Sequence, residues 1–437
     1  MKLTKTKTKF KQTEVGMIPE DWEIKTFSSV LLGKTRNGLY KSKEFRGKGI
    51  KMINMGELFK YDKIGDCDME LVELSNSEKQ KFLVKPGDLL FARRSLVAEG
   101  AGKCSLIVGN AERTFESSII MARPNPKEAN SEYLFYLFKS KFGKFLLDTI
   151  LRQVAVSGIT GSDLMRLNIP IPPLPEQHYI AKILSELDSK IELNHRVNKT
   201  LEAIGQAIFK YWFIDFEFPN EEGKLYKSSG GEMVDSELGK IPKGWKIKNV
   251  EDFIIFEKGV EPGSKVYSTK ISEENIRFLR VGDVSSPRRE QTFIPLNPTE
   301  RKSCREDDIL LTLDATIGIV RIGMKGVHSS GVRKVYSKEN NVVPKSYIYS
   351  LLKSKEIQDT IYTYANGTTI LHAGKSLNYM YVPVPDKIIF KEFADLAEPI
   401  FNKLVNNLVE ITILENIRDS LLPKLMSGKI RVPVEVK

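Results

Sequence analysis

The segment around Lys103 is the part of the sequence that comes closest to a catalytic loop. Residues 99–104 read Glu-Gly-Ala-Gly-Lys-Cys, and glycines before a lysine are typical of loops that hold phosphate groups through backbone N–H groups. The first glycine of that motif is missing, and no Ser or Thr follows the lysine to bind Mg²⁺. The third glycine of a dinucleotide-binding turn is missing as well. We therefore expect a structural turn here.

Other arrangements that would indicate catalysis are absent from the sequence. It contains no Asp- or Asn-Pro-Pro-aromatic motif for base methylation, no Gly-x-Ser-x-Gly and no His-Glu-x-x-His. The three cysteines and four histidines are scattered, which predicts no disulfide framework and no structural metal site in this chain. A nuclease needs only a few carboxylates, however. The 56 acidic residues therefore leave a self-contained DNA methyltransferase or nuclease open as an alternative.

Basic side chains gather in stretches that we expect to be loops. The chain has a formal net charge of +11, which favours a polyanionic partner such as double-stranded DNA. Loops carried on rigid strands suit phosphate contacts, and a few arginines can reach base edges. The predicted DNA-binding patches comprise Arg36, Lys41, Lys43, Arg46, Lys48, Arg93, Arg94, Lys103 and Arg113 in the first half, and Lys265, Arg280, Arg288, Arg289, Arg321, Arg333 and Lys334 in the second. For any single member, a solvated surface charge is the alternative interpretation.

An internal repeat indicates how the elements that carry these loops are organised. Residues 14–25 read EVGMIPEDWEIK and residues 237–248 read ELGKIPKGWKIK, with Gly, Ile-Pro, Trp and Ile-Lys at the same spacing. Residues 169–172 likewise resemble residues 382–385. Because the period is about half of the chain, the sequence predicts two copies of one domain-sized unit.

Short apolar runs predict strands in each copy, and periodic segments predict helices. The predicted strands are residues 89–92, 119–122, 309–313 and 317–322. Helices are predicted near residues 132–150 and 345–362. Each copy then ends in an extended stretch that contains prolines, which cannot continue a helix. The pattern is typical of a mixed α/β domain.

A long helix with an apolar seam follows each proline stretch. Apolar side chains step by three or four residues along both helices, as in a coiled coil. The two seams match at an offset of 213 positions. The predicted helix-pair interface comprises Leu184, Leu187, Ile191, Asn194, Leu201, Ile208, Ile400, Leu404, Asn407, Ile411, Leu414 and Leu421.

Three residues interrupt the seams. Asn194 and Asn407 either lie inside the seam, where they can pair and fix the register, or lie at its edge in contact with water. Pro399 falls inside the second pattern, where a proline costs about 3 kcal/mol. We therefore expect a kink at Pro399 or a fresh helix that begins there. Residues 217–236 are polar and rich in glycine, which predicts a linker between the copies.

Several segments, taken together, resemble one protein family. Residues 169–177 (IPIPPLPEQ) followed by 180–184 (IAKIL) resemble the junction between a target-recognition domain and a conserved spacer helix in the specificity subunits of type I restriction-modification enzymes. Residues 209–216 resemble the end of their first spacer, the two Gly-x-Ile-Pro-x-x-Trp segments the start of each recognition domain, and residues 422–430 their carboxyl end. The resemblance covers nearly the whole chain. Residues 382–387 depart from it, because they lack the Pro-Leu-x-Glu-Gln continuation.

The resemblance implies a mixed α/β fold. Two globular target-recognition domains, related by a pseudo-twofold repeat, would be joined by two long antiparallel helices that resemble a coiled coil. The expected segments are a basic N-terminal arm (1–13), the first recognition domain (14–175), the first spacer helix (176–216), a linker (217–236), the second recognition domain (237–388), the second spacer helix (389–428) and a C-terminal tail (429–437).

The resemblance also implies a function. Each recognition domain would read one half of a split site in double-stranded DNA. The subunit would bind two methyltransferase (modification) subunits, which use S-adenosylmethionine to methylate adenine. It would also work with restriction subunits, which translocate and cleave DNA using ATP. This chain would then be non-catalytic and would hold no cofactor of its own.

A scaffold whose paired helices assemble other proteins is the second alternative. It predicts no salt-dependent DNA affinity, whereas phosphate contacts weaken steeply as salt rises. An enzyme would instead be active as the purified chain with S-adenosylmethionine or a divalent metal. The start of the chain has no apolar core, and no apolar run approaches the length of a membrane span. We therefore expect a cytoplasmic protein with no membrane partner.

Overall fold

The computed structural model of the chain describes residues 8–95, 100–152, 157–286, 291–296, 302–339, 342–368 and 370–432. The chain folds as two compact units. Unit 1 comprises Met1–Lys190 and Leu414–Lys437, and unit 2 comprises Ile191–Ile413. Each unit therefore contains one copy of the sequence repeat together with segments of both long helices.

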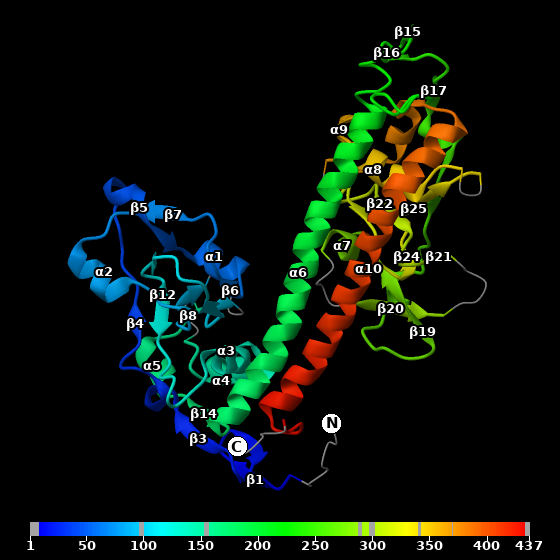
Figure 1. Ribbon diagram of the computed structural model, residues 1–437. Coiled ribbons are helices and arrows are strands. Elements are labelled where there is room, and N and C mark those ends of the chain that lie inside the picture. The colour runs from blue at the N-terminus through cyan, green and yellow to red at the C-terminus, as the bar shows by residue number, and fades with distance from the viewer. Residues whose placement is uncertain are drawn as a thin grey trace. The chain divides into compact units, whose positions relative to one another are not determined.

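Unit 1 is built on two β-sheets and additional strand pairs (Figure 1). Its strands are β1 (Phe10–Thr13), β2 (Gly16–Pro19), β3 (Glu23–Thr26), β4 (Arg36–Asn37), β5 (Arg46–Ile53), β6 (Lys63–Ile64), β7 (Glu70–Val72), β8 (Leu89–Ala92), β9 (Arg94–Ser95), β10 (Cys104–Ile107), β11 (Arg113–Phe115), β12 (Ile119–Ala122), β13 (Ser157–Gly158) and β14 (Asn168–Ile171). One sheet has the order β4-β12-β8-β10-β6 and the other β11-β5-β7. The pairs are β1 with β2, β3 with β14, and β9 with β13.

Strand β8 lies at the centre of the core of unit 1. Leu89 and Phe91 pack into one apolar cluster, whereas Leu90 and Ala92 pack into another. Alternate side chains of a strand point to opposite faces of the sheet, so both faces are covered here. This explains why the strand is a continuous apolar run and not an alternating one.

The helices of unit 1 are α1 (Met55–Lys60), α2 (Asn76–Phe82), α3 (Ser131–Lys139), α4 (Lys141–Thr149), α5 (Gly161–Met165), the first part of α6 (Leu174–Phe213) and the last part of α10 (Lys387–Met426). The helical structure predicted near residues 132–150 is confirmed as two short helices, because the chain turns between α3 and α4. Ser140 caps α4, since its Oγ accepts a hydrogen bond from the N–H of Gly143 at 3.0 Å. Gly143 permits the turn, because a Cβ at that position would lie 2.0 Å from the Leu137 carbonyl oxygen.

Unit 2 contains corresponding elements. Its strands are β15 (Met233–Ser236), β16 (Gly239–Pro242), β17 (Lys246–Asn249), β18 (Ile254–Lys258), β19 (Asn275–Leu279), β20 (Thr292–Pro295), β21 (Ser303–Cys304), β22 (Ile309–Thr312), β23 (Val320–Arg321), β24 (Gly326–His328), β25 (Val332–Ser337) and β26 (Tyr381–Val384). Its helices are α7 (Val281–Ser285), α8 (Lys345–Leu352), α9 (Lys355–Thr363) and parts of α6 and α10 (Lys387–Met426). The helix predicted near residues 345–362 is also two helices, because Ser354 caps α9.

The order of the strands confirms the repeat. In unit 2 the order β18-β25-β22-β23 matches β4-β12-β8-β10 of unit 1. In the other sheet β19 is parallel to β24 and antiparallel to β20, as β5 is to β11 and β7. The predicted strands at residues 89–92 and 119–122 are β8 and β12, and that at 309–313 is β22. The strand predicted at 317–322 shortens to β23, because Gly318 has a left-handed φ of +78°.

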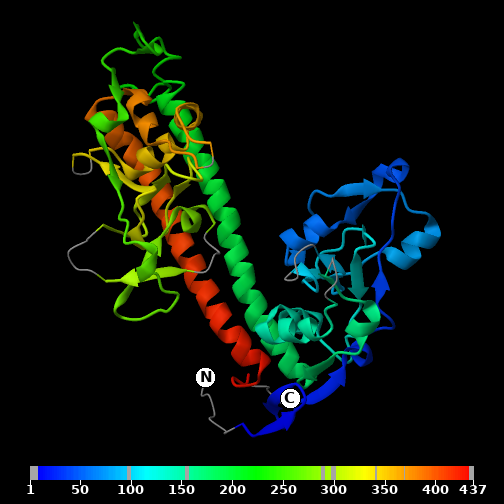
Figure 2. The same cartoon turned by 180° about the vertical axis from the view of Figure 1, so that it is seen from behind.

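The two long helices run antiparallel within each unit. In unit 2, Asn194 of α6 donates a hydrogen bond to Glu410 of α10, and the ring of Trp212 lies 5.7 Å from that of Phe393. Residue numbers thus fall along α10 as they rise along α6, and the two segments lie side by side in both views (Figure 1, Figure 2). The structure buries Leu184, Ile191, Asn194, Leu404, Asn407 and Ile411, and half-buries Leu187, Leu201, Ile208, Ile400, Leu414 and Leu421.

The two seam asparagines are buried, at 3% and 2% exposure, so the interpretation that they lie at a wet edge is wrong. They do not pair with each other. Asn407 donates to the side-chain oxygen of Asn198 at 2.8 Å, and Asn194 donates to Glu410 at 2.9 Å. Asn198 in turn donates to the carbonyl of Leu404 at 3.4 Å. The polar positions of the seam are therefore satisfied by hydrogen bonds.

Helix α10 continues unbroken through Pro399, so the expected fresh start at this residue is wrong. A mid-helix proline removes one hydrogen bond and crowds the preceding turn. Phe393, Ala397 and Phe401 on either side are nearly fully buried in the core of unit 2. Their burial offsets the cost of the proline and holds the turn in place.

The segments expected to be an arm and a linker contain regular structure. Phe10–Thr13, the end of the arm, forms β1 and pairs with β2. The last four residues of the linker form β15, which pairs with β16. Phe218 is buried, and its ring stacks on Trp245 with centroids 5.2 Å apart. The hairpin of unit 2 thus begins before the expected boundary at residue 237.

His328 on β24 makes the stability of unit 2 dependent on pH. The ring is fully buried, its Nε2 lies 3.3 Å from the carbonyl oxygen of Glu257, and its Nδ1 has no partner within the described part of the chain. Burial lowers the pKa of His328 below its ordinary value of 6.5. The folded state therefore binds fewer protons than the unfolded state, and stability is lost as pH falls below about 6.5.

We expect the unfolding midpoint of the wild type to fall more steeply between about pH 6.5 and 5 than that of His328→Gln. The variant lacks the imidazole ring that takes up a proton on unfolding at low pH. The difference in unfolding midpoint between the wild type and His328→Gln should therefore narrow as pH falls. Calorimetry in buffers of equal ionic strength measures this. His195→Gln, which removes an exposed histidine on α6, should keep the wild-type slope. Parallel pH profiles for His328→Gln and the wild type would contradict the expectation.

Candidate nucleic-acid interface

The loop that follows β8 is the first candidate surface in unit 1. Arg94 on β9 pairs with Gly158 on β13, so the segment after α4 is held against this loop. The N–H of Ile159 donates to the carbonyl of Arg93 at 3.0 Å. A Cβ at Gly158 would lie 2.9 Å from that carbonyl oxygen, so the close approach requires glycine. The Arg93 guanidinium donates to the carbonyl of Ser117 at 3.3 Å, which fixes its direction.

The corresponding loop in unit 2 follows β22 and carries a different set of side chains. Asp314 accepts a hydrogen bond from Nδ1 of His372 at 2.7 Å. Ala315 has a left-handed φ of 59°, a conformation that is rare outside glycine. Tyr364 and Tyr379, both exposed, stack with ring centroids 3.8 Å apart. Asp314 in this loop thus holds the imidazole of His372 in one orientation, and Tyr364 and Tyr379 present a stacked pair of exposed rings.

Most of the predicted basic residues already have partners. Six form ion pairs: Lys41 with Glu78, Arg46 with Glu70, Lys48 with Glu73, Lys103 with Asp62, Arg280 with Asp283, and Lys334 with Glu257. Four others donate to main-chain carbonyls: Arg36, Arg93, Arg321 and Arg333. Surface ion pairs contribute little stability, so those side chains can exchange partners with phosphate at small cost.

Three predicted residues are exposed and have neither a hydrogen bond nor an ion pair within the residues that the structure describes: Lys43, Arg94 and Lys265. Lys43 lies in unit 1 and follows the short strand β4. Arg94 lies on β9, and Lys265 precedes β19 of unit 2. These cations can bind an anion without first giving up a protein partner. Arg288 and Arg289 lie outside the described residues.

The prediction that Arg113 contacts DNA is wrong. Its side chain is fully buried on β11, so it cannot reach a ligand in solvent. The guanidinium donates to four main-chain carbonyls, those of Ile64, Val108, Gly109 and Ala111. Arginine has five donors in a fixed fork, which suits it to hold several carbonyl groups together. Its role is to close the loop before β11.

Sequence reasoning missed His372, which it counted only among scattered histidines. A signal was present in the repeat. Gly158 of the first copy corresponds to His372 of the second. Gly158 pairs with Arg94 and Arg152, as His372 pairs with Asp314 and Asn366, so each stretch is held against the loop that follows the central strand. A Cβ at Gly367 would meet the carbonyl oxygen of Ile370 at 2.0 Å, so this turn too requires glycine. Aligning the two copies over this stretch places His372 beside Asp314.

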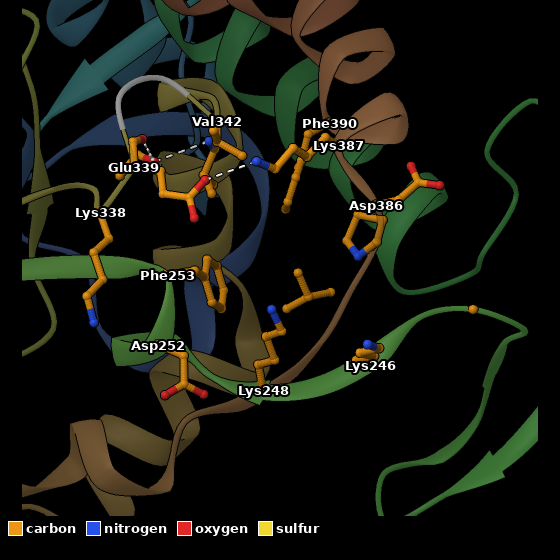
Figure 3. Close-up of a pocket in the computed structure, with 15 residues that line it drawn as sticks. Lys246, Lys248, Asp252, Phe253, Lys338, Glu339, Val342, Asp386, Lys387 and Phe390 are labelled. Carbon is orange, nitrogen blue, oxygen red and sulfur yellow. Dashed lines mark hydrogen bonds and ion pairs between the residues drawn. The ribbon is translucent and has the colours of Figure 1, made fainter.

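A hollow of about 430 Å³ lies between β17, β26 and the start of α10 in unit 2 (Figure 3). Phe253 and Phe390 form part of its apolar lining, and Lys248 points toward it. At the rim, Lys387 forms an ion pair with Glu339 at 3.1 Å.

Two searches of the described residues bear on the kind of site. Over those ranges, no group of His, Cys, Asp and Glu side chains is arranged to hold a metal ion. No helix in the same ranges is long and apolar enough to cross a membrane.

The chain is similar to known sequences over most of its length. The chain matches the family described as "Type I restriction modification DNA specificity domain" twice, over residues 19–203 and 242–410. It is 30% identical to the type I restriction enzyme MjaIX specificity subunit of Methanocaldococcus jannaschii, over 97% of each chain. It is 24% identical to the HindI specificity subunit of Haemophilus influenzae, over 87% of this chain and 94% of the relative.

Comparison with solved structures concerns the fold alone. The structure is similar to the crystal structure of a type I restriction-modification system S subunit from M. genitalium, with a TM-score of 0.58 and 17% sequence identity. The match covers 92% of this chain and 96% of the other. The two matched ranges of the sequence family fall one in each copy of the repeat.

Proposed function

The chain belongs to the family of type I restriction-modification DNA specificity subunits, and on this premise we propose that units 1 and 2 each read one half of a split site in double-stranded DNA. The observation that carries the proposal is the duplication: one chain contains two units with the same order of strands. A split site needs two readers in one molecule, whereas a single enzymatic centre does not require duplication.

The loops after β8 and β22 are the proposed reading surfaces. Arg94 is exposed on β9, and an arginine guanidinium can donate to O6 and N7 of guanine in the major groove. In unit 2, Asp314 orients His372, and Arg333 on β25 interacts electrostatically with the same carboxylate. These side chains can donate to base edges, while exposed lysines such as Lys43 and Lys265 contact phosphates. The two units carry different side chains here, so the two halves of the site should differ in sequence.

The catalytic steps belong, in this proposal, to partner subunits. Two modification subunits would bind this chain and methylate adenine with S-adenosylmethionine, and restriction subunits would translocate and cleave DNA. The curated relatives are named specificity subunits, which supports a non-catalytic role for this chain. Activity of the purified chain with S-adenosylmethionine or a divalent metal would favour the self-contained enzyme instead.

Methylation mapping tests the proposal directly. The chain is co-expressed with its modification subunit in a host that lacks adenine methylation, and methylated adenines are mapped genome-wide. We expect one motif made of two defined halves and a fixed gap of unspecified bases. A continuous motif, or no motif, would contradict the proposal.

Two alanine variants assign the halves to the units. We expect Arg94→Ala to weaken reading of one half and His372→Ala that of the other, each by about 1–3 kcal/mol, or roughly 5- to 150-fold in affinity. Lys227→Ala removes an equally exposed charge from the segment before β15 and should leave both halves intact. Binding that does not weaken as salt rises would point to the scaffold alternative.

A further inference from the structure

In each unit a tyrosine on a short helix contacts a carboxylate of α6. Tyr136 lies on α3 and Tyr349 on α8. Their positions in the repeat are adjacent and not equivalent, because the caps Ser140 and Ser354 align the two copies at an offset of 214, which pairs Tyr349 with Phe135. Tyr136 is fully buried and Tyr349 is 6% exposed. In each unit the tyrosine hydroxyl donates a hydrogen bond to a carboxylate on α6.

In unit 1 the carboxylate is that of Asp188. Its Oδ2 accepts the hydrogen bond from Tyr136 at 2.7 Å, and its Oδ1 lies 2.9 Å from Nη1 of Arg418 on α10. The side chains of Asp188 and Arg418 are only 17% and 18% exposed, so the pair is largely shielded from water. One carboxylate therefore links the domain that carries α3 to both long helices.

In unit 2 the carboxylate is that of Glu202. It accepts a hydrogen bond from Tyr349 and another from Nζ of Lys353 at 2.7 Å. The ring of Tyr349 also lies 5.7 Å from that of Phe401 on α10. As in unit 1, one tyrosine contacts α6 through a charged acceptor and is linked to α10 as well. The cation that contacts the carboxylate differs between the units. In unit 1 it is Arg418 on α10, whereas in unit 2 it is Lys353, which belongs to the domain.

The hydroxyls of Tyr136 and Tyr349 are in the state that a strong hydrogen bond to a carboxylate requires. Burial raises the pKa of both Tyr136 and Tyr349, so both hydroxyls stay protonated. Burial also acts to raise the pKa of Glu202, but the hydrogen bonds from Lys353 and Tyr349 outweigh it, and the pKa is lowered. A hydrogen bond to a charged acceptor is strong and directional, whereas apolar contacts are not. It therefore selects one orientation of the domain on the helices, where apolar packing alone would allow several.

We propose that Tyr136 and Tyr349 are positioning residues that hold each reading domain at one angle on the helix pair and thereby restrict recognition to a single gap between the two half-sites. The inference rests on the proposed function, because a gap has meaning only for a split site. Neither tyrosine needs to touch DNA for this role. The hydroxyl, and not the ring, is the group that matters.

Removing only the hydroxyl tests the proposal. The complete methyltransferase complex is made with Tyr136→Phe, with Tyr349→Phe and with both, and it is offered duplexes in which the two half-sites are separated by the native gap or by one base pair more or less. We expect each single variant to raise the ratio of off-gap to native-gap methylation by about tenfold. The double variant should raise it further, while the sequence of each half stays unchanged.

Tyr133→Phe is the matched control. Tyr133 also lies on α3 and is fully buried, but its hydroxyl donates to the carbonyl of Pro170 at 2.9 Å within the same domain. Its loss should lower stability without changing the gap ratio. If Tyr136→Phe and Tyr349→Phe lower methylation equally at all gaps, as Tyr133→Phe would, the two tyrosines are merely structural and the inference is overturned.

The wild-type complex separates this inference from the proposed function. If the wild type methylates no split site, the proposed function fails, and the inference fails with it. If the wild type requires one gap and the phenylalanine variants require it as strictly, only the inference fails. A variant too unstable to assemble is replaced by Asp188→Asn or Glu202→Gln, which keep the shape of the acceptor and remove its charge. These variants must also relax the gap.

Discussion

Replacing Arg431 with alanine is expected to lower the free energy of unfolding of unit 1 by about 3–5 kcal/mol, because it leaves a buried carboxylate without its cation. The carboxylate is that of Glu176 at the start of α6, which is fully buried. Arg431 donates to both of its oxygens, at 2.7 and 2.8 Å. The same guanidinium donates to Asp21 at 2.9 and 2.6 Å, so it ties the end of the described chain to its first strands.

Within the residues that the structure describes, Glu176 would keep one neutral donor after this change. The indole N–H of Trp22 donates to it at 3.1 Å, and a single hydrogen bond does not compensate a buried negative charge. The loss should appear as a lower midpoint in thermal or urea unfolding. It should also appear as faster hydrogen exchange in peptides that cover residues 16–26 and 168–184.

Two further variants identify the cause. Glu176→Gln combined with Arg431→Ala removes the buried charge along with its partner, so it should recover much of the lost stability. Asp21→Ala should have a small effect, because its side chain is 51% exposed and its pair with Arg431 is screened by solvent. Equal stability of Arg431→Ala and the wild type would show that Glu176 does not need Arg431 as its charged partner in the folded protein.

Strands and long helices could be predicted from the sequence because both depend on local apolar patterns. The predicted strands at residues 89–92 and 119–122 coincide with β8 and β12, whose side chains are all buried. Helices α6 and α10 each span 40 residues and begin 213 positions apart, which is the offset of the two seams. Nothing outside the segment is needed to recognise such a pattern.

Contacts between distant residues could not be predicted in this way. The offset aligns equivalent positions of the two helices, such as Asn194 and Asn407. Antiparallel packing instead brings together positions that are not equivalent, and Asn407 therefore meets Asn198. The pairing of Arg431 with Glu176, 255 positions away, is likewise invisible to a local pattern. Both contacts depend on the register in which the segments pack, and this register follows from the whole fold.

Charge was the least informative signal at the level of single residues, as Arg113 demonstrates. We expect Arg113→Ala to lower the free energy of unfolding by about 3 kcal/mol or more, because several buried carbonyl groups lose their donor and a cavity forms. The shortest of these hydrogen bonds, to Val108 and Ile64, measure 2.7 and 2.8 Å. Burial lowers the pKa of Arg113, but an arginine remains protonated at neutral pH.

The same substitution at Arg94 should behave in the opposite way, and the pair of variants forms one experiment. Arg94 is exposed, so Arg94→Ala should leave the free energy of unfolding within about 0.5 kcal/mol of the wild-type value and reduce DNA affinity.

Arg113→Lys keeps the charge, but a single ammonium cannot satisfy four carbonyls at the angles that the guanidinium reaches. It should therefore lose most of the stability that Arg113→Ala loses. At a temperature where each variant is folded, DNA affinity should stay at the wild-type value for both Arg113 variants and fall for Arg94→Ala. Weaker DNA binding by folded Arg113→Lys would mean that the buried guanidinium lies closer to DNA than its four carbonyl partners allow.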